Sequence, residues 1–349
     1  MNDRILIVGP SWVGDMVMAQ TLFKSLAKTR PGVQIDVMAP PAALAVANRM
    51  QEVDRTILFD IAHGQLGISY RRQFARSLKD RDYQQAIVLP NSLKSALVPW
   101  FADIENRTGF LGEMRYFLLN DIRLLDKKRL PRMIDRFVAL GDEPNTKDAS
   151  LPVPSLPELS FPELGVDSKN QSECLSRLSL DMERPVLAIC PGAEFGDAKR
   201  WPEAHYAGLC NYAIERGMQV WIFGSPRDEK VAAGIVSGID DKARSHNLTG
   251  RTTLVDVVDL LALARLVVSN DSGLMHIAAA VGCETTVVYG STSPDFTPPL
   301  THKLNIVSDK LSCSPCFKRD CPLGHKDCLN KLLPDRLHPI IDNVLGESR

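Results

Sequence analysis

The sequence contains no apolar run that approaches the roughly 18 residues a helix needs to cross a bilayer. Its start does not resemble a signal peptide, because Asp3 and Arg4 lead directly into the short strand-like run Ile5-Leu6-Ile7-Val8. Together these absences predict a cytoplasmic protein, which meets a membrane, if at all, as a peripheral protein on the cytoplasmic face of the inner membrane.

Neither sign of charge dominates the chain. The sequence has 41 Lys and Arg residues and 42 Asp and Glu residues, for a formal net charge of −1. This balance argues against a general nucleic-acid binder, so we expect no nucleic-acid partner. Cysteine is scarce as well, and eight residues spread unevenly over 349 are too few for a disulfide scaffold.

Two nucleotide-binding fingerprints are also missing. Gly9 and Gly14 follow the first strand-like run, but the sequence there has neither Gly-x-Gly-x-x-Gly nor a following Gly-Lys-Ser/Thr. This disfavours an NAD-dependent enzyme and a P-loop enzyme. Asp36, at the end of the second strand-like run, leaves a weak nicotinamide-cofactor interpretation open.

What the chain does contain is a repeated strand–turn–helix pattern. Strand-like runs at 4–9, 34–38 and 85–89 in the first half, and at 185–190, 219–223 and 284–289 in the second, alternate with polar turns and helical patterns. A length of 349 residues predicts roughly two domains. The fold class we expect is therefore α/β, with two doubly wound, Rossmann-like domains whose strand ends face a central cleft.

A Pro-rich stretch from 151 to 165 is the best candidate for a linker between the domains. We expect an N-terminal domain over 1–165, ending in this linker, and a C-terminal domain over 166–333. In the second domain the strand at 284–289 is predicted to close the sheet. The remaining residues, 334–349, are predicted to form a C-terminal helix that packs back at the domain junction.

The most informative stretch runs from Val267 to His276. An apolar β-branched run ends in Asn270-Asp271-Ser272-Gly273, and a helical pattern begins at once. The free amides at such a helix start bind anions, and Ser272 and Gly273 let a phosphate approach. Asp271 suits sugar hydroxyls, and His276 lies one turn along on nearly the same face. An ordinary helix cap with a core-facing histidine is the alternative.

The first half carries a similar turn and two basic clusters. Asp15 follows the first strand, where α/β sheets place their chemistry, although a helix-start acid favoured by the dipole explains it equally well. The clusters at 70–79 and 126–132 are basic, with Arg107 and Arg115 between them. They are compatible with plain solvated faces, with an anionic acceptor or with an anionic membrane surface.

Four cysteines follow the second domain's last predicted strand: Cys313, Cys316, Cys321 and Cys328. Their spacing, with His325 among them, is compatible with a small metal knuckle that holds zinc or an iron–sulfur cluster, or with disulfides. A metal held by four thiolates would be structural, because zinc would keep no open position.

Several motifs taken together resemble the ADP-heptose:lipopolysaccharide heptosyltransferases, glycosyltransferase family 9. The main ones are Gly14-Asp15, Lys199-Arg200-Trp201-Pro202, Gly224-Ser225-Pro226-Arg227-Asp228 and 271–276, and supporting ones lie at 89–92, 112–116, 191–196 and 293–299. The run 9–16 is most similar to the heptosyltransferase II branch. The resemblance covers residues 5 to about 303 and leaves out the cysteine segment and the tail.

The resemblance implies a GT-B architecture and an inverting, metal-independent transfer that requires no cofactor. The donor would be ADP-L-glycero-β-D-manno-heptose, and the acceptor the first heptose of the lipopolysaccharide inner core, on heptosyl-Kdo2-lipid A. An inverting transfer needs one base, for which Asp15 is the candidate, and a countercharge for the departing diphosphate, for which Lys199 is the candidate.

The family match also implies the binding residues. The donor set is Gly192, Ala193, Lys199, Asp228, Asp271, Ser272, Gly273 and His276. The acceptor set is Asn91, Ser92, Lys94, Arg107 and Arg115. The family's paired hydroxyl residues are here Gly192 and Ala193, so any phosphate contact at these positions comes from backbone amides.

Three alternatives stay open. The first is heptosyltransferase I or another ADP-heptose transferase, because the N-terminal domain sets the acceptor. The second is a nucleotide-sugar epimerase of the same two-domain build, and the third is a non-catalytic nucleotide-sugar binding protein.

Overall fold

The structure is a computed structural model that describes residues 3–62, 64–142 and 159–346. The chain divides into two compact units, Met1–Pro162 and Glu163–Arg349. Most of the predicted Pro-rich linker, including Pro152, Pro154 and Pro157, lies outside the described residues.

The N-terminal unit is built on a parallel sheet with the strand order β3-β2-β1-β4-β5-β6. The strands are β1 (Arg4–Val8), β2 (Gln34–Ala39), β3 (Arg55–Leu58), β4 (Gln85–Val88), β5 (Asn106–Phe110) and β6 (Asp121–Arg123). The central strands are buried beyond their first residue and mostly apolar, as expected of a sheet covered on both faces.

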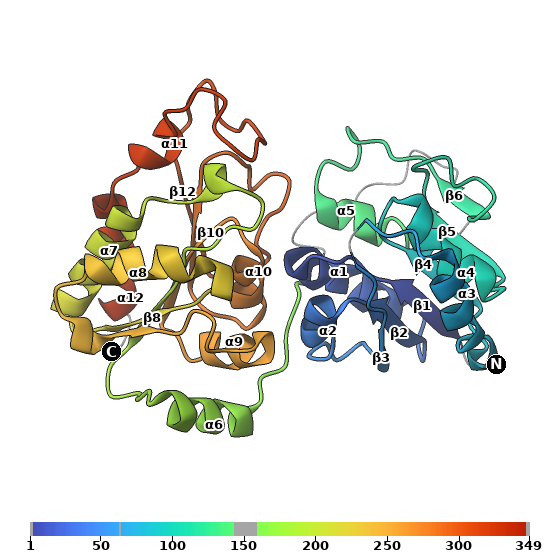
Figure 1. Cartoon of the computed structure of the whole chain (residues 1–349), viewed down its shortest axis with the longest axis horizontal. Helices are drawn as coiled ribbons and strands as arrows, with labels where there is room; N and C mark the ends of the chain where they lie inside the picture. The colour runs from blue at the N-terminus through green and yellow to red at the C-terminus, as the bar shows by residue number, and fades with distance from the viewer. Residues whose placement is uncertain (1–2, 63, 143–158, 347–349) are drawn as a thin grey trace. The chain divides into compact units, whose positions relative to one another are not determined.

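Helices supply the crossovers that parallel strands require. They are α1 (Val13–Thr29), α2 (Pro41–Ala47), α3 (Ile68–Arg76), α4 (Leu97–Phe101) and α5 (Met133–Val138), with short 3-10 turns η1 (Lys79–Arg81) and η2 (Leu93–Ala96). Helix α1 packs against α2 and α5, and α3 packs against α4, which gives two helical layers (Figure 1). Residues such as Leu6, Val8 and Val88 form the core between sheet and helices.

The C-terminal unit repeats this topology with the order β12-β11-β10-β7-β8-β9, again parallel throughout. Its strands are β7 (Val186–Cys190), β8 (Gln219–Ile222), β9 (Ser245–Asn247), β10 (Leu266–Asn270), β11 (Thr285–Tyr289) and β12 (Leu304–Ser308). In both units the strand order reverses at the first strand, between β1 and β4 and between β7 and β10. Ligands of open α/β sheets bind at such switch points, beyond the carboxyl ends of the strands.

The helices of this unit cover both faces of its sheet. They are α6 (Ser168–Leu178), α7 (Glu203–Glu215), α8 (Glu229–Ser237), α9 (Leu254–Leu261), α10 (Gly273–Ala280), α11 (Asp327–Asn330) and α12 (His338–Gly346), with 3-10 turns η4 (Asp197–Lys199), η5 (Pro226–Asp228), η6 (Lys242–Arg244) and η7 (Pro334–Leu337). Helix α12 places Ile341 and Val344 in the same core as α7, and its Asp342 pairs with Arg216 at 2.6 Å. Its expected packing at the domain junction stays a prediction.

The expected fold class, two doubly wound α/β domains, is confirmed, and two details of the sequence prediction are corrected. The strand 284–289 does not close its sheet, because β12 pairs with β11 from Thr285–Leu304 to Tyr289–Ser308. The short strands β3, β6 and β9 were not foreseen, because they are only partly buried and carry little apolar pattern.

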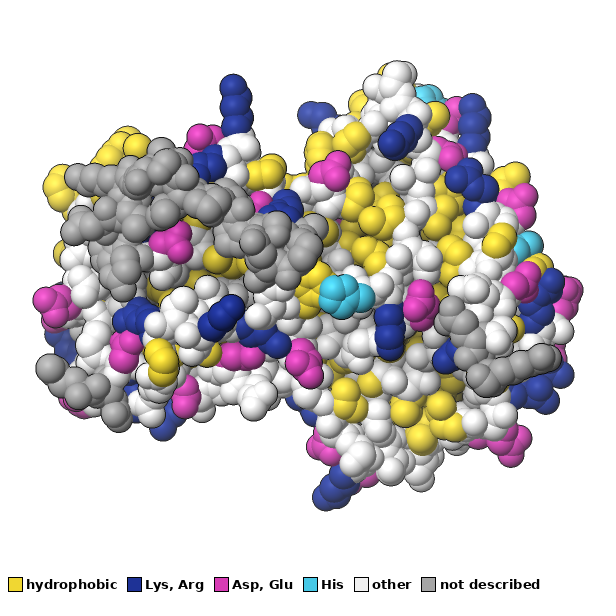
Figure 2. All heavy atoms as spheres, turned by 180° about the vertical axis from the view of Figure 1, so that it is seen from behind, with side chains coloured by type: hydrophobic (Ala, Val, Ile, Leu, Met, Phe, Trp, Pro, Cys, Tyr) yellow, Lys and Arg dark blue, Asp and Glu magenta, His cyan; other side chains and the backbone are white. Residues whose placement is uncertain are grey.

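The surface matches the balanced charge of the sequence. Figure 2 shows Lys and Arg side chains interspersed with Asp and Glu over the face that it presents. No helix among the described residues is both long enough and apolar enough to cross a membrane.

Candidate active site

The turn from β10 into α10 has the geometry predicted for it. Strand β10 is buried along its whole length, and α10 begins at Gly273. Ser272 precedes the helix in an extended conformation (φ −145°, ψ 170°), and its side chain makes no capping hydrogen bond. The first-turn amides therefore point out of the helix at the switch point without a side-chain cap, which is the arrangement that binds a phosphate group.

Lys199 and Asp271 meet at this turn. Lys199 ends η4, in the loop that follows β7, and its Nζ lies 2.6 Å from Asp271 Oδ2. The side chains are only 15% and 6% exposed, and the ammonium also lies 5.0 Å from the centre of the Phe195 ring. A cation and a carboxylate thus stand together beside the free helix amides. Sequence reasoning assigned both residues to the donor without predicting that they pair.

His276 lies one turn into α10 and is buried. Burial lowers the pKa of its imidazole to about 4, against a smaller raising effect of Asp271, and Lys199 adds to the lowering. The ring is therefore neutral at neutral pH. It can give or accept one hydrogen bond near a phosphate, but it cannot supply the positive charge that Lys199 supplies.

Asn270, which sequence reasoning did not select, fastens the turn to the loop after β7. This fully buried side chain donates to Pro191 O (2.6 Å) and accepts from Trp201 N (3.1 Å) and from Tyr206 Oη (3.1 Å). Its amide therefore fixes the position of the loop that carries Lys199. The signal that could have identified it is an amide side chain at the end of a buried strand, where every polar atom needs a partner.

Asp228 and Gly192 lie close together at the same edge. Asp228 is buried, and its Oδ2 accepts from Ser225 N (2.9 Å) and Ser225 Oγ (2.7 Å). Its Oδ1 is 3.8 Å from the guanidinium of Arg200. A Cβ atom at Gly192 would lie 2.8 Å from the Asp228 carboxylate, so the backbone passes here only because residue 192 is glycine. Ala193, next to it, is buried.

In the N-terminal unit the predicted base lies at the corresponding switch point. Asp15 is partly buried in the first turn of α1, just beyond the end of β1. Val8 and Val88 are register partners, so β1 and β4 end side by side. Asn91, Ser92 and Lys94 follow β4, with Asn91 exposed. The topology thus brings Asp15 and these three predicted acceptor residues to one edge of one sheet.

Two other predicted acceptor residues turn inward. Arg115 is 1% exposed, and its guanidinium donates to Phe110 O, Pro90 O and Ser92 O at 2.6, 2.7 and 3.1 Å. Burial lowers its pKa to about 10, so it stays protonated at neutral pH. Arg107 likewise donates to Leu118 O at 2.8 Å. Both guanidinium groups therefore tie the loop after β5 to its surroundings.

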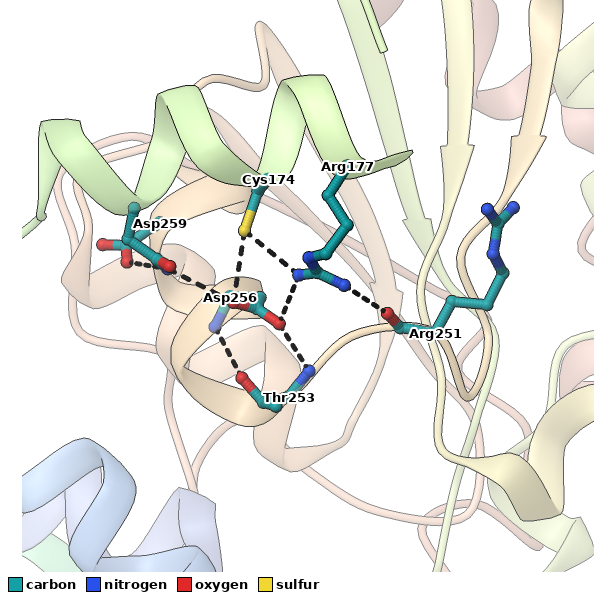
Figure 3. A network of polar contacts seen from close by, with 7 residues as sticks. Cys174, Arg177, Arg251, Thr253, Asp256 and Asp259 are labelled. Carbon is teal, nitrogen blue, oxygen red and sulfur yellow. Dashed lines mark hydrogen bonds and ion pairs between the residues drawn. The ribbon is translucent and has the colours of Figure 1, made fainter. Parts of the chain in front are cut away.

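A separate polar network in the C-terminal unit joins α6 to α9 (Figure 3). On α6, Cys174 Sγ lies 3.1 Å from Asp256 Oδ1, and Arg177 pairs with Asp256 Oδ2 at 2.9 Å. Thr253 caps α9 by accepting from Asp256 N at 3.2 Å. A groove of about 850 Å³ runs beside this network, and none of the predicted donor or acceptor residues is among the described residues that line it. The network holds α6 on α9.

No group of three or more His, Cys, Asp or Glu side chains is arranged as a ready metal site in the described part of the chain. Cys313, Cys316, Cys321 and Cys328 are all free and partly exposed.

Comparison with known proteins identifies the family of the chain. Residues 71–327 match glycosyltransferase family 9 (heptosyltransferase). The chain is 43% identical to lipopolysaccharide heptosyltransferase 2 of Salmonella typhimurium strain LT2, over 99% of each chain. It superposes on the solved structure of E. coli ADP-heptose lps heptosyltransferase II with a TM-score of 0.88 and 41% identity, over 99% of each chain. Lipopolysaccharide heptosyltransferase 1 of Pseudomonas aeruginosa strain PAO1 is 27% identical, over 91% of this chain and 87% of its own.

Proposed function

Since the chain belongs to glycosyltransferase family 9, the heptosyltransferases, we propose that it is a lipopolysaccharide heptosyltransferase II. It transfers L-glycero-D-manno-heptose from ADP-heptose to the first heptose of the inner core, with inversion and without a metal. The observation that carries this proposal is the Lys199–Asp271 pair beside the uncapped start of α10, in a chain that is 43% identical to a heptosyltransferase 2 along its whole length.

The donor binds at the switch point of the C-terminal unit. Its diphosphate gains negative charge as the bond to the anomeric carbon breaks. The ammonium of Lys199 and the amides of Ser272 and Gly273 stabilise that charge, and the neutral ring of His276 adds a hydrogen bond. A preorganised donor of this kind typically contributes ~10²–10³ in rate. Asp271, already placed by Lys199, accepts hydrogen bonds from the heptose hydroxyls.

Asp228 marks the nucleoside end of the donor site. Its Oδ2 is occupied by Ser225, and its Oδ1 faces Arg200 at the looser distance of 3.8 Å. We assign Oδ1 to a ribose hydroxyl. The backbone at Gly192 and Ala193, which approaches Asp228 closely, offers amides to the diphosphate.

Asp15 acts on the acceptor. It takes the proton from the attacking hydroxyl as the new glycosidic bond forms at the anomeric carbon and ADP leaves with the old bonding pair. A positioned base of this kind is typically worth ~10²–10⁴-fold. Asn91, Ser92 and Lys94, at the same edge, bind the acceptor sugar and its anionic groups. Arg107 and Arg115 act indirectly, by fixing the loop after β5.

The test is heptose transfer from ADP-heptose in the presence of EDTA, onto Kdo2-lipid A and onto heptosyl-Kdo2-lipid A. We expect turnover only on the heptosylated acceptor, and a loss of ~10²–10⁴-fold in kcat in Asp15→Asn. Glu203→Gln is the matched control, because Glu203 is also an acid in the first turn of a helix but lies on α7 and is exposed. Turnover on the bare acceptor would instead identify heptosyltransferase I. Turnover of the donor without any acceptor would identify an epimerase, and no reaction on either acceptor would refute the transferase.

We further propose that the loop after β5 meets the surface of the membrane that carries the acceptor lipid. Phe117 is 89% exposed and Met114 is 81% exposed at its tip, while Arg115 between them is buried and anchors the loop. The loop starts beside β6, where Leu111 N donates to Arg123 O at 2.8 Å, and the exposed residues Leu124, Lys127 and Lys128 follow. Apolar side chains flanked by exposed cations match an anionic bilayer surface.

Vesicle sedimentation tests this second proposal. The protein should bind vesicles containing phosphatidylglycerol more tightly than vesicles of phosphatidylcholine alone, and Phe117→Ser should weaken that binding. Leu58→Ser is the control, because Leu58 is also exposed, at 56%, but lies on β3. Equal binding by both variants would contradict the assignment of this loop.

A further inference from the structure

Trp12 is a large aromatic residue at a position where helices usually carry a small polar one. It is the N-cap of α1, with φ −86° and ψ 136°, and its carbonyl accepts a hydrogen bond from Met16 N at 2.9 Å. Short side chains with a hydrogen-bond acceptor are preferred here, because they can cap the first amides of the helix. An indole has a donor but no acceptor, and Trp12 makes no capping hydrogen bond. Helix capping therefore does not explain this residue.

Packing does not explain Trp12 either. It is 55% exposed, whereas Met16 and Val17 in the same part of α1 are buried. Within the described residues its ring stacks on no other aromatic ring, and its Nε1 makes no hydrogen bond. The other exposed tryptophan, Trp100, packs on the ring of Phe101 with the centroids 5.0 Å apart. Trp12 thus presents an aromatic face to whatever binds at the start of α1.

The neighbours of Trp12 are polar groups that suit a sugar. Asp15 lies three residues further along α1, and residues with this spacing are neighbours on a helix. Strand β4 pairs with β1, and the exposed Asn91 follows it at the same edge of the sheet. Asn91 Oδ1 accepts from Arg115 at 3.4 Å, while within the described residues no hydrogen bond occupies Nδ2, which can donate to a hydroxyl. An aromatic face beside a few polar groups is typical of a small-molecule site.

On the basis of the function proposed above, we propose that the indole of Trp12 stacks on the terminal heptose of the acceptor, the sugar whose hydroxyl Asp15 deprotonates. A pyranose ring presents C–H groups on its faces and hydroxyls around its rim. The C–H groups carry a small positive charge, which the negative face of an aromatic ring attracts. Asp15 and Asn91 bind hydroxyls of the same sugar.

Stacking on Trp12 also distinguishes between the two candidate acceptors. Heptose is neutral, whereas Kdo carries a carboxylate. The negative face of the indole attracts the C–H face of a neutral sugar and repels a carboxylate. Trp12 therefore favours an acceptor whose last sugar is heptose, and Lys94, on η2, is left to the carboxylates of the Kdo residues.

Substitution of Trp12 should affect the acceptor and not the donor. Trp12→Ala should raise KM for heptosyl-Kdo2-lipid A about tenfold, as expected for one lost aromatic contact, and should leave kcat and KM for ADP-heptose within about twofold. Trp12→Phe keeps an aromatic face and should restore most of the affinity. Trp100→Ala is the matched control, because it removes the other exposed tryptophan, on α4, and should change none of these constants.

Iodide quenching of tryptophan fluorescence tests the contact without any transfer. The sequence has four tryptophans, and Trp201 and Trp221 are buried, so in Trp100→Phe iodide quenches mainly Trp12. The lipid-free sugar heptosyl-Kdo2 should protect this variant from quenching, and lipid-free Kdo2 should protect it several-fold more weakly. Sugars without lipid exclude an effect of membrane contact on the fluorescence.

Several outcomes would overturn the proposal. Two are an unchanged KM for the acceptor in Trp12→Ala and a loss confined to kcat, which would indicate a disturbed Asp15. Equal protection by Kdo2 and heptosyl-Kdo2 would also contradict it. Protection that appears with rising protein concentration alone would show that a second copy of the chain covers Trp12. The quenching experiment decides the matter even if Trp12→Ala fails to fold, because it keeps the tryptophan.

The two measurements also separate this contact from the proposed function. Protection by heptosyl-Kdo2 in a protein that transfers no heptose would support the contact and refute the function. Heptose transfer that Trp12→Ala leaves unchanged would support the function and refute the contact.

Discussion

The neutral state of His276 leads to a measurable loss of stability in mild acid. The pKa of this histidine falls from 6.5 to about 4 on folding. At a pH between these two values, His276 binds a proton in the unfolded chain but not in the folded chain. The free energy of unfolding is therefore highest above pH 6.5, and it decreases as the pH falls towards 4. At about 1.4 kcal/mol per pKa unit the full effect is ~3 kcal/mol, of which about 2 kcal/mol is lost by pH 5.

Urea unfolding of wild type and His276→Gln at pH 7 and pH 5 measures this effect. Fluorescence of the buried Trp201 and Trp221 follows the C-terminal unit. His205 and His246 also have lowered pKa values through burial, but both are present in the two proteins, so the double difference isolates His276. We expect acid to destabilise wild type by about 2 kcal/mol more than the variant. A difference between the two proteins that does not change with pH would refute the assignment of a neutral, buried His276.

Three other single substitutions and one double variant test the donor site. Asn270→Ala leaves three buried partners without a hydrogen bond, at about 1–3 kcal/mol each, and should lower the free energy of unfolding by ~3–9 kcal/mol. A loss below about 1 kcal/mol in urea titration would contradict the geometry. Lys199→Met should destabilise by about 3–5 kcal/mol by leaving the Asp271 carboxylate unpaired, and should reduce kcat ~10²–10³-fold. The double variant Lys199→Met/Asp271→Asn should regain stability but not activity, and recovery of activity would exclude Lys199 as the countercharge. Gly192→Ala places a methyl group against the Asp228 carboxylate. It should lower the free energy of unfolding by about 1–3 kcal/mol and raise KM for ADP-heptose. An unchanged KM would show that this backbone does not contact the donor.

The predictions that succeeded depended on chemistry within a few consecutive residues. The turn after β10 is an example: a buried apolar strand, an Asn-Asp-Ser-Gly turn and a helix follow one another with no distant partner needed to specify them. The same holds for β1 and the start of α1, whose first turn is formed by Val13, Gly14 and Asp15 directly after the strand and its turn.

The edges of the sheets were less predictable. Strands β6 and β9 have three residues each and no fully buried position, so they exist through pairing with a neighbouring strand rather than through their own pattern. Pairing partners lie far away in the sequence, and local periodicity contains no trace of them.

The sequence by itself determined the α/β class, the two-fold repetition of the domain, the strand–turn–helix geometry at 270–273 and the helix-start acid at Asp15, because each follows from local propensity and periodicity. The tertiary structure alone decided what long side chains do. The sequence predicted that Arg115 and Arg107 bind an acceptor, but both guanidinium groups donate to backbone carbonyls. Lys199 pairs with Asp271, which lies 72 positions away in the sequence. The physical reason is that a charged side chain acts on whatever the fold places within a few ångströms of it, and only the folded chain sets those distances.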